Sequence, residues 1–340
     1  MNRIKRLIGG IGGDKLILMA AIIVVFALFT SLNRNFLTPT NITNILVATS
    51  LVGLVAIGET YLVIAGHVDL SPGSLVALSG VLAALLVSKG VAFFPALLIT
   101  LFAGAAVGLA NSLMTSKIKL EPFIATLVTQ SIVRGFAYIL CGGKPVAISD
   151  ATFLRVSRLR FPVFLNEGSK LSFSGIPLAV WIMIAAFALF GFILARTKFG
   201  RSIYAVGGNK DAARLAGLNP QRIMLVCYVM MGVICAVGGV VFAARMNSGQ
   251  PAANVNLEFD AITAVILGGV SFSGGVGSMG GTILGVILIQ SFNTGLTMVN
   301  VQSFWQLVAR GGLLLFALTS DYIRKANREK NLLADSKRNS

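Results

Sequence analysis

The feature that most constrains this chain is a series of apolar segments, each about twenty residues long, that recurs along its whole length. An α-helix needs about 20 apolar residues to cross a hydrocarbon layer about 30 Å thick. Apolar residue types make up 56% of the 340 residues and charged types only 12%, which leaves too few polar side chains for a soluble surface. The sequence therefore predicts an all-α, polytopic membrane protein with a single transmembrane domain over residues 1–340.

Ten segments have the character of membrane-spanning helices. We place these spans at Leu16–Leu32, Ile45–Gly66, Ser71–Ser88, Phe93–Ser116, Pro122–Cys141, Pro177–Ala195, Arg222–Ala244, Phe259–Phe272, Gly280–Met298 and Phe304–Tyr322. Two of them look discontinuous. The third begins with Ser71 as a helix cap and Pro72 at the first helical position, and the eighth is too short to cross alone. Because interrupted spans are tolerated only where protein or water satisfies the backbone, these breaks point to a transport pathway.

Basic residues indicate which ends of the spans face the cytoplasm, because Lys and Arg near a span resist translocation. Residues 1–15, the Lys117/Lys119 turn, residues 196–222 and residues 323–340 are all basic, and an even number of spans puts all four inside. We read the first apolar segment as an uncleaved span, since no small-residue cleavage site follows it. Residues 142–176 then fall outside, although they too are basic. The net charge of +16 follows from this topology, so nucleic acid is not an expected partner.

Residues 196–222 form a basic segment between two long spans. It holds six Lys or Arg residues and one acid, Asp211. Within it, DAARLAGL predicts a short helix, because Asp211 favours the helix N-terminus and Gly217 suits the C-terminal stop. A short helix held at the inner face of a membrane is well placed to bind a soluble partner.

The two halves of the chain contain a weak internal repeat. Asn111 is followed after twelve residues by Phe123 and then by Arg134, and Asn293 is followed after eleven by Phe304 and then by Arg310. With ten spans, Asn111 lies near an inner membrane face and Asn293 near an outer one, which predicts an inverted repeat as in many transporters. Shared composition of membrane spans is the alternative explanation.

Several polar side chains lie within or beside the predicted spans and are candidates for a translocation pathway. These are Glu59, His67, Asp69, Asn111, Gln130, Arg134, Asn293 and Arg310. Such groups are costly in hydrocarbon and usually face a bundle interior. For the two arginines we favour a structural role, either an ion pair such as Glu59 with Arg134 or hydrogen bonds to carbonyl groups. The amides could equally join neighbouring helices.

No sequence pattern indicates catalysis or a cofactor. The chain lacks G-x-x-x-x-G-K-[ST], G-x-S-x-G and H-E-x-x-H, so we expect no nucleotide site, catalytic residue or metal site of its own. The three cysteines show neither disulfide nor metal-ligand spacing. An ion-coupled carrier of a small polar solute is the alternative function, but such a carrier usually keeps several acids or histidines at mid-membrane.

Five stretches together resemble a known family. They are IAGHVDLSPGSLVALSG, FIATLVTQSIVRGFAYI, TKFGRSIYAVGGNKDAARLAGLNP, ARMNSGQP and LEFDAITAVILGGVSFSGGVGSMGGTILG. In this order they closely resemble the monosaccharide ABC-importer permeases of the ribose, arabinose and galactose type. The resemblance implies a homodimeric permease of the bacterial inner membrane, surrounded by lipid, with a fold similar to the vitamin B12 importer permease. It also implies a separate ABC ATPase subunit inside and a periplasmic sugar-binding protein outside.

The resemblance assigns the ATPase-coupling role to the 196–222 segment. The residues that match are Gly200, Arg201, Gly207, Gly208, Asn209, Ala212, Ala213 and Gly217. In the periplasmic segment 142–176, Arg155, Arg158 and Arg160 could pair with acidic residues of the docking binding protein. The alternative for these three is ordinary solvated charge.

Overall fold

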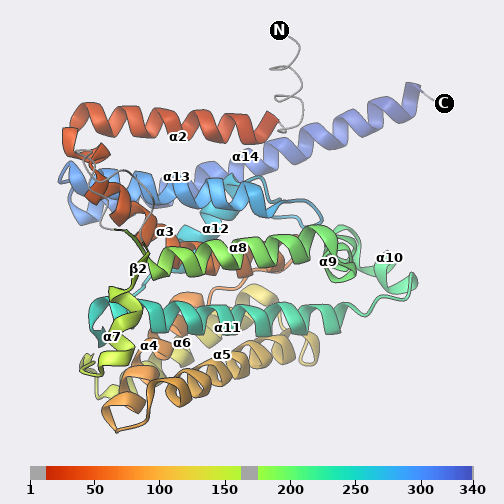
Figure 1. Cartoon of the computed structure of the whole chain (residues 1–340). Helices are drawn as coiled ribbons and strands as arrows, with labels where there is room; N and C mark the ends of the chain where they lie inside the picture. The colour runs from red at the N-terminus through yellow and green to blue at the C-terminus, as the bar shows by residue number, and fades with distance from the viewer. Residues whose placement is uncertain (1–12, 162–174, 339–340) are drawn as a thin grey trace.

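The computed structural model describes residues 13–161 and 175–338, and helices dominate both parts (Figure 1). The helices are α2 (Gly13–Leu32), a 3-10 turn η1 (Arg34–Leu37), α3 (Pro39–Ile64), α4 (Pro72–Ser88), α5 (Phe93–Ser116), α6 (Pro122–Cys141), α7 (Ala151–Arg158), α8 (Leu178–Arg196), α9 (Lys198–Gly208), α10 (Lys210–Leu215), α11 (Pro220–Met246), α12 (Leu257–Leu267), α13 (Met279–Met298) and α14 (Ser303–Arg338). Two short antiparallel ladders pair β1 (Val146–Ala147) with β4 (Ser248–Gly249), and β2 (Arg160–Phe161) with β3 (Ile176–Pro177).

A helix occupies each of the ten predicted span positions. Among the described residues, seven helices are long and apolar enough to cross a membrane, namely α2, α3, α5, α6, α8, α11 and α13. The two predicted discontinuous spans are short, since α4 has 17 residues and α12 has 11. The all-α, polytopic membrane fold is confirmed, whereas the count of ten crossings stays a prediction.

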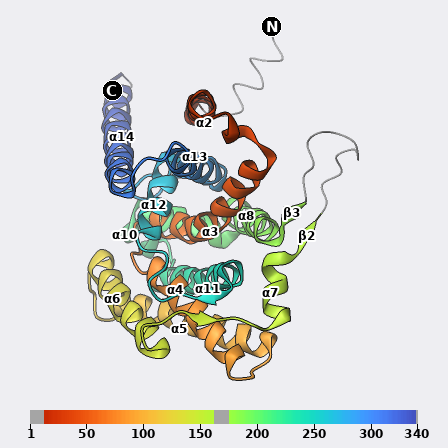
Figure 2. The ribbon, with the colours of Figure 1, turned by 90° about the vertical axis from the view of Figure 1, so that its left-hand side faces the viewer.

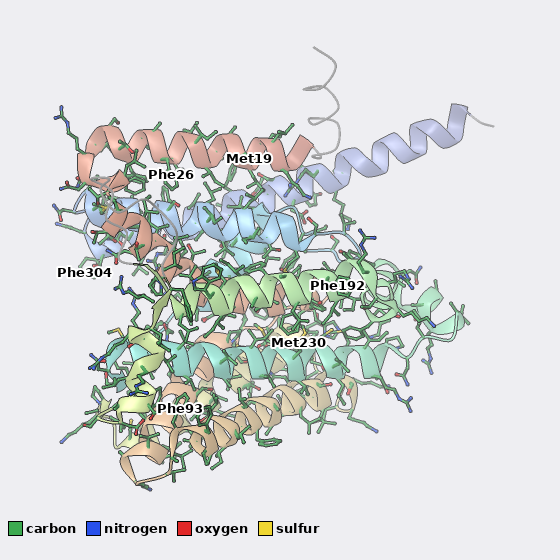
Figure 3. The ribbon with its side chains drawn as sticks, in the orientation of Figure 1. Met19, Phe26, Phe93, Phe192, Met230 and Phe304 are labelled. Carbon is green, nitrogen blue, oxygen red and sulfur yellow. The ribbon has the colours of Figure 1, made fainter. Side chains whose placement is uncertain are left out.

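The long helices lie side by side, and the chain connections divide between the two ends of the bundle (Figures 1 and 2). We call the right-hand end of the bundle in Figure 1 the α10 end. It holds the start of α2, the pair α9–α10 and the far end of α14. Helix α7 lies at the opposite, α7 end. Phe93 and Phe304, in the first turns of α5 and α14, lie at the α7 end in Figure 3, and Phe192 near the end of α8 lies towards the α10 end. The 196–222 segment and the end of α14 therefore share one side, as the charge pattern predicts; residues 1–12 lie outside the described part.

Each of the two short helices, α4 and α12, packs against helices from both halves of the chain. Helix α4 packs against α5, α6 and α11, and α12 packs correspondingly against α13, α14 and α3. The crossings are close: a Cβ on Gly104 of α5 would meet the Gly232 carbonyl of α11, and one on Gly285 of α13 would meet the Ala264 carbonyl of α12. Asn111 and Asn293 each lie five residues before the end of their helix. Helix α5 ends at the α10 end and α13 at the α7 end, so the halves run in opposite senses, in agreement with the predicted inverted repeat.

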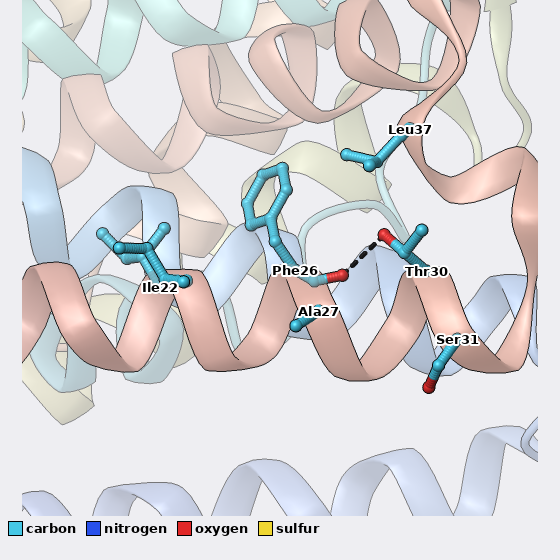
Figure 4. A pocket seen from close by; sticks show the side chains of 7 residues that line it. Ile22, Phe26, Ala27, Thr30, Ser31 and Leu37 are labelled. Atoms are coloured by element: carbon cyan, nitrogen blue, oxygen red, sulfur yellow. Dashed lines mark hydrogen bonds between the residues drawn. The ribbon is translucent and has the colours of Figure 1, made fainter.

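Helix α3 forms the centre of the bundle, and α2 lies at its edge. Residues Val52 to Ala65 are all buried. Helix α2 is held mainly at its end, where the Asn33 amide donates to the Met298 carbonyl (2.8 Å) and Phe29 packs on Phe292. The side of α2 that faces η1, with Ile22 and Phe26, lines an open apolar groove of about 640 Å³ (Figure 4).

Candidate coupling surface and translocation pathway

The turn from α8 into α9 is tight and begins a helix that sequence reasoning read only as a loop. Thr197 caps α9 by accepting a hydrogen bond from the Gly200 amide (3.2 Å), and Gly200 lies against the Leu194 carbonyl with no room for a Cβ. Ile203 and Val206 are buried, and Phe199 stacks on Tyr61. Apolar residues at 199, 203 and 206 have helical spacing, so this periodicity is the signal that could have revealed α9.

Helix α10 is the predicted short helix, and its two ends explain its limits. The Asn209 side chain accepts a hydrogen bond from the Ala212 amide (2.9 Å) and caps the N-terminus. At the other end Gly217 has φ +85°, and the Gly217 and Leu218 amides donate back to the Arg214 and Ala213 carbonyls. This left-handed glycine ends the helix as predicted.

The predicted coupling residues divide into an exposed and an inward group. Exposed are Arg201, Gly208, Asn209, Ala212 and Gly217. The other three pack inward: Gly200 as above, Gly207 against the Ile64 carbonyl, and Ala213 as a buried side chain. Only the first group can touch a partner directly in this conformation. The sequence analysis did not single out Leu215, which is 90% exposed. Residues 213 and 215 point to opposite sides of a helix, so the signal was a leucine on the side of α10 opposite Ala213.

The glycine-rich loop 268–278 joins α9 to the short helix α12 and to α14. On one side the Gly275 amide donates to the Ile64 carbonyl (2.8 Å) and the Tyr204 hydroxyl donates to the Gly277 carbonyl (2.9 Å). On the other side the buried Asp321 carboxylate of α14 accepts from the Phe272 amide (2.9 Å). The loop therefore bonds to the end of α3, to α9 and to α14, and it follows directly on the last residue of α12. The sequence showed the glycines as a break but gave no sign of Tyr204 or Asp321 as their partners.

A cavity of about 650 Å³ opens at the α10 end between α10 and the turn that joins α5 to α6. Lys119, Lys210 and Arg214 lie in its wall, and His67 lines it from the segment between α3 and α4. The His67 Nδ1 lies 3.2 Å from the Tyr228 hydroxyl of α11. The cavity thus brings one of the predicted pathway residues to the side that carries α10.

The start of α4 carries a buried polar cluster. Asp69 Oδ1 accepts hydrogen bonds from the Ser71 amide (2.8 Å) and the Ser71 hydroxyl (2.6 Å). The Asn111 amide of α5 donates to the Ser71 hydroxyl (3.1 Å). Ser71 holds the predicted N-cap position before Pro72, but its hydroxyl makes no capping hydrogen bond, because it donates to Asp69 and accepts from Asn111 instead.

The start of α12 carries a second polar cluster, which mirrors the first. The Asn293 amide of α13 donates to Asp260 Oδ2 (3.2 Å), and Arg310 of α14 pairs with the same oxygen at 3.5 Å. An Asn–Asp hydrogen bond is thus present in both halves, because in the first half the Asn111 side-chain amide donates to Asp69 Oδ2 (3.4 Å). The sequence repeat showed the two asparagines without their acidic partners.

Helix α6 contacts the start of α12 through two of the predicted pathway residues. Gln130 donates to Glu258 Oε1 (2.7 Å), and Arg134 donates to the carbonyls of Pro251 (2.8 Å) and Ala253 (2.6 Å). Arg134 therefore binds carbonyl groups, one of the two structural roles considered for it. The alternative pair with Glu59 is not formed: Glu59 is fully buried, and neither carboxylate oxygen bonds to any residue in the described ranges.

The three arginines predicted to meet a binding protein lie at the α7 end, opposite α10. Asp150 caps α7 by accepting from the Phe153 amide (2.7 Å), which orients the helix with Arg155 and Arg158 exposed. Arg160 lies just beyond, on β2, and is also exposed. The remainder of the predicted outer segment, residues 162–174, lies outside the described part of the chain.

Comparison with known proteins gives one consistent result. Residues 41–318 match the family described as the permease component of branched-chain amino acid transport systems. An L-arabinose ABC transporter permease of Azospirillum brasilense is 37% identical over 306 residues, covering 90% of this chain and 87% of the relative. The ribose import permeases of Haemophilus influenzae and Bacillus subtilis are 35% and 36% identical over 303 residues, covering 88% and 89% of this chain and 91% of each relative. No solved structure matches the chain, so the likeness to the vitamin B12 permease stays a prediction.

Proposed function

The chain belongs to the family of ABC-importer permeases that includes the ribose and L-arabinose permeases, and we propose that it carries a monosaccharide across the bacterial inner membrane. It is the transmembrane permease subunit of such an importer. ATP hydrolysis would take place on a separate ATPase subunit, and the sugar would arrive on a periplasmic binding protein. The α10 end then faces the cytoplasm and the α7 end the periplasm.

One observation carries the ATPase-docking part of the proposal. Helix α10 is folded and capped at both ends, and it exposes the apolar side chain of Leu215 beside Arg214 and Lys210. An exposed leucine on a short helix is a suitable anchor for a hydrophobic groove on a partner. The exposed Arg201 on α9 adds a group that can bind carboxylates or carbonyls of the ATPase.

A movement of α9 and α10 would reach the pathway through the loop 268–278. Gly207 lies too close to the Ile64 carbonyl and the Gly275 amide for α9 to shift alone, and Tyr204 holds Gly277 directly. The loop follows directly on the last turn of α12, and the first turn of that 11-residue helix carries Glu258 and Asp260. We expect closure of two ATPase subunits to move α9, and the loop to transmit that movement to α12.

A second copy of the chain would cover the flank formed by α6 and α14. Figure 2 shows both helices on the same side of the bundle. Along this flank the Arg310 side chain is 34% exposed and Asp260 13%, and Gln130 and Arg134 are half-buried. Ionised groups facing hydrocarbon are costly, so a single copy in lipid would be poorly solvated here. Pairing of two copies through this flank would place these groups along a shared pore.

The exposed arginines at the α7 end would hold the binding protein. Arg155 and Arg158 project from a rigid, capped helix, and Arg160 follows on β2. Reversing all three charges should weaken docking and uptake most strongly at low ionic strength, where charge attraction acts furthest. Docking and uptake equal to those of the unmodified protein would assign these residues to ordinary solvated charge.

Replacement of Gly217 tests the coupling proposal. Gly217→Pro removes the amide that donates to Arg214 and forbids φ +85°, so the end of α10 must be rebuilt. The change lies at an exposed site with no neighbouring atom within reach of a Cβ, so insertion into the membrane should be unaffected. Gly217→Asn is the matched control, because asparagine tolerates the left-handed conformation. We expect loss of uptake and ATPase binding only in the proline variant; normal binding there would remove α10 from the docking site.

A further inference from the structure

Residues 251–256 have no helical structure and lead directly into α12. From the side of α6, Arg134 holds this segment by donating to the Pro251 and Ala253 carbonyls. From the side of α14, Arg310 holds Asp260 in the following first turn of α12. Two arginines, one from each half of the inverted repeat, therefore fix both ends of the stretch 251–260 between the helices that form the α6–α14 flank.

The backbone of this segment is unusual for residues that are not glycine. Asn254 has φ +60° and Asn256 has φ +68°. L-residues rarely adopt this left-handed conformation, and asparagine accepts it more readily than most. Two such residues in one short stretch turn the chain sharply and leave Val255 between them 63% exposed. The turn thus presents Val255 at the surface, while Pro251 at the start of the segment stays buried.

The two asparagine amides have no structural task that accounts for them. Asn256 occupies the N-cap position of α12, yet its side chain makes no cap hydrogen bond. The Asn254 Nδ2 is buried without any acceptor among the described residues, and Glu258 Oε2 nearby is likewise unpartnered. The Asn254 carbonyl and Glu258 Oε2 both crowd the Cβ position of Gly73 at the start of α4, so the two residues are neighbours. An unpartnered donor and an unpartnered acceptor therefore belong to neighbouring residues, and a hydroxyl group can both accept from such a donor and donate to such an acceptor.

We propose that residues 251–256 are the sugar-contacting element of the pathway, with the Asn254 and Asn256 amides donating to hydroxyl groups of a passing monosaccharide. The proposal rests on the proposed function, since it takes the cargo to be a sugar. In the present conformation the start of α4 lies against Asn254 and Glu258, Asn256 is half-buried, and Val255 is the accessible residue between the two asparagines. A movement of α12 away from α4 would uncover the rest.

The first experiment does not depend on the cargo. Val255→Cys is introduced into a Cys141→Ala background and treated with a membrane-impermeant methanethiosulfonate in proteoliposomes that contain the assembled transporter. Phe102→Cys on α5, where the native side chain is 75% exposed, is the control for a lipid-facing position. We expect rapid modification at Val255→Cys and little at Phe102→Cys. Equal resistance of the two positions to the reagent would place the segment in lipid and overturn the proposal.

The second experiment tests the amides themselves. The double variant Asn254→Gly/Asn256→Gly keeps the left-handed backbone and removes both side chains. With labelled D-ribose and L-arabinose as probes, we expect uptake to fall about tenfold, which is the loss of roughly one to two net hydrogen bonds. ATP hydrolysis stimulated by the binding protein should be retained, which a merely structural role would not allow. Asn300→Gly, at another left-handed asparagine (φ +57°) at the end of α13, is the matched control.

The outcomes separate the two proposals. Failure of the unmodified transporter to take up either sugar, with Val255→Cys still modified, would refute the sugar cargo but keep the segment in the pathway. Uptake by the double variant equal to that of the unmodified protein and of Asn300→Gly would refute the sugar-contacting role alone.

Discussion

Truncation of Leu215 should weaken ATPase binding without affecting the permease itself. Leu215 is 90% exposed at the end of α10, so it contributes almost nothing to the fold of the free subunit. Burial of a leucine side chain in a partner groove is worth about 1.5–3 kcal/mol. Leu215→Ala retains one carbon of the side chain, so we expect a loss of about 2 kcal/mol, or a Kd about 30-fold weaker.

The assay is a titration of the ATPase subunit into purified permease in lipid nanodiscs, together with a thermal melt of the permease alone. Leu37→Ala is the matched control, because Leu37 is 50% exposed in the η1 turn away from α10. The melting temperature of Leu215→Ala should equal that of the unmodified protein, since surface truncations change stability by about 0.5 kcal/mol or less. An unchanged Kd would show that α10 does not insert Leu215 into the ATPase. A lowered melting temperature would contradict the structure of α10.

Three further predictions concern the interior of the permease. Asp321→Asn weakens the charge-assisted bond to the Phe272 amide, so uptake per ATP hydrolysed should fall several-fold; an unchanged ratio would remove the loop 268–278 from the coupling route. Gly285→Ala forces a methyl against the Ala264 carbonyl and should cost about 1–3 kcal/mol in a thermal melt, whereas a similar cost at the uncrowded Gly280 would contradict this packing. Arg310→Gln leaves the Asp260 carboxylate with only the Asn293 amide as a partner and should lower stability by about 1.5–3 kcal/mol, and adding Asp260→Asn should restore most of it; failure of this rescue would show that the ion pair is not the cause.

The features that sequence reasoning found are those with local causes. Pro72 marks the start of α4 because it lacks the amide hydrogen that a first helical position does not use. Gly217 marks the end of α10 because a left-handed residue must follow the helix there. The positions and lengths of the apolar segments located the ten helices and showed that α12 is short. Each of these signals is contained in a few consecutive residues.

The features that it missed depend on residues far apart in the chain. Asp69 and Asn111, or Asp321 and Phe272, become partners only when helices from different parts of the sequence pack together. The Glu59–Arg134 pair looked reasonable because both charges needed compensation, but Arg134 lies closer to the carbonyls of residues 251 and 253. Helix α9 was hidden by its glycines, although Gly200 and Gly207 are required for close approach to the Leu194 and Ile64 carbonyls. These two glycines therefore indicate close helix packing and not a loop.

ATP-driven sugar uptake tests the central claim most directly. The permease is reconstituted in proteoliposomes with its ATPase subunit and its binding protein, and uptake of labelled ribose, arabinose and leucine is measured with ATP or with an imposed ion gradient. The account predicts uptake of a monosaccharide that requires ATP and both partners and that is indifferent to the gradient. Uptake driven by the ion gradient without ATP would contradict the importer, and uptake of leucine in place of sugar would contradict the cargo.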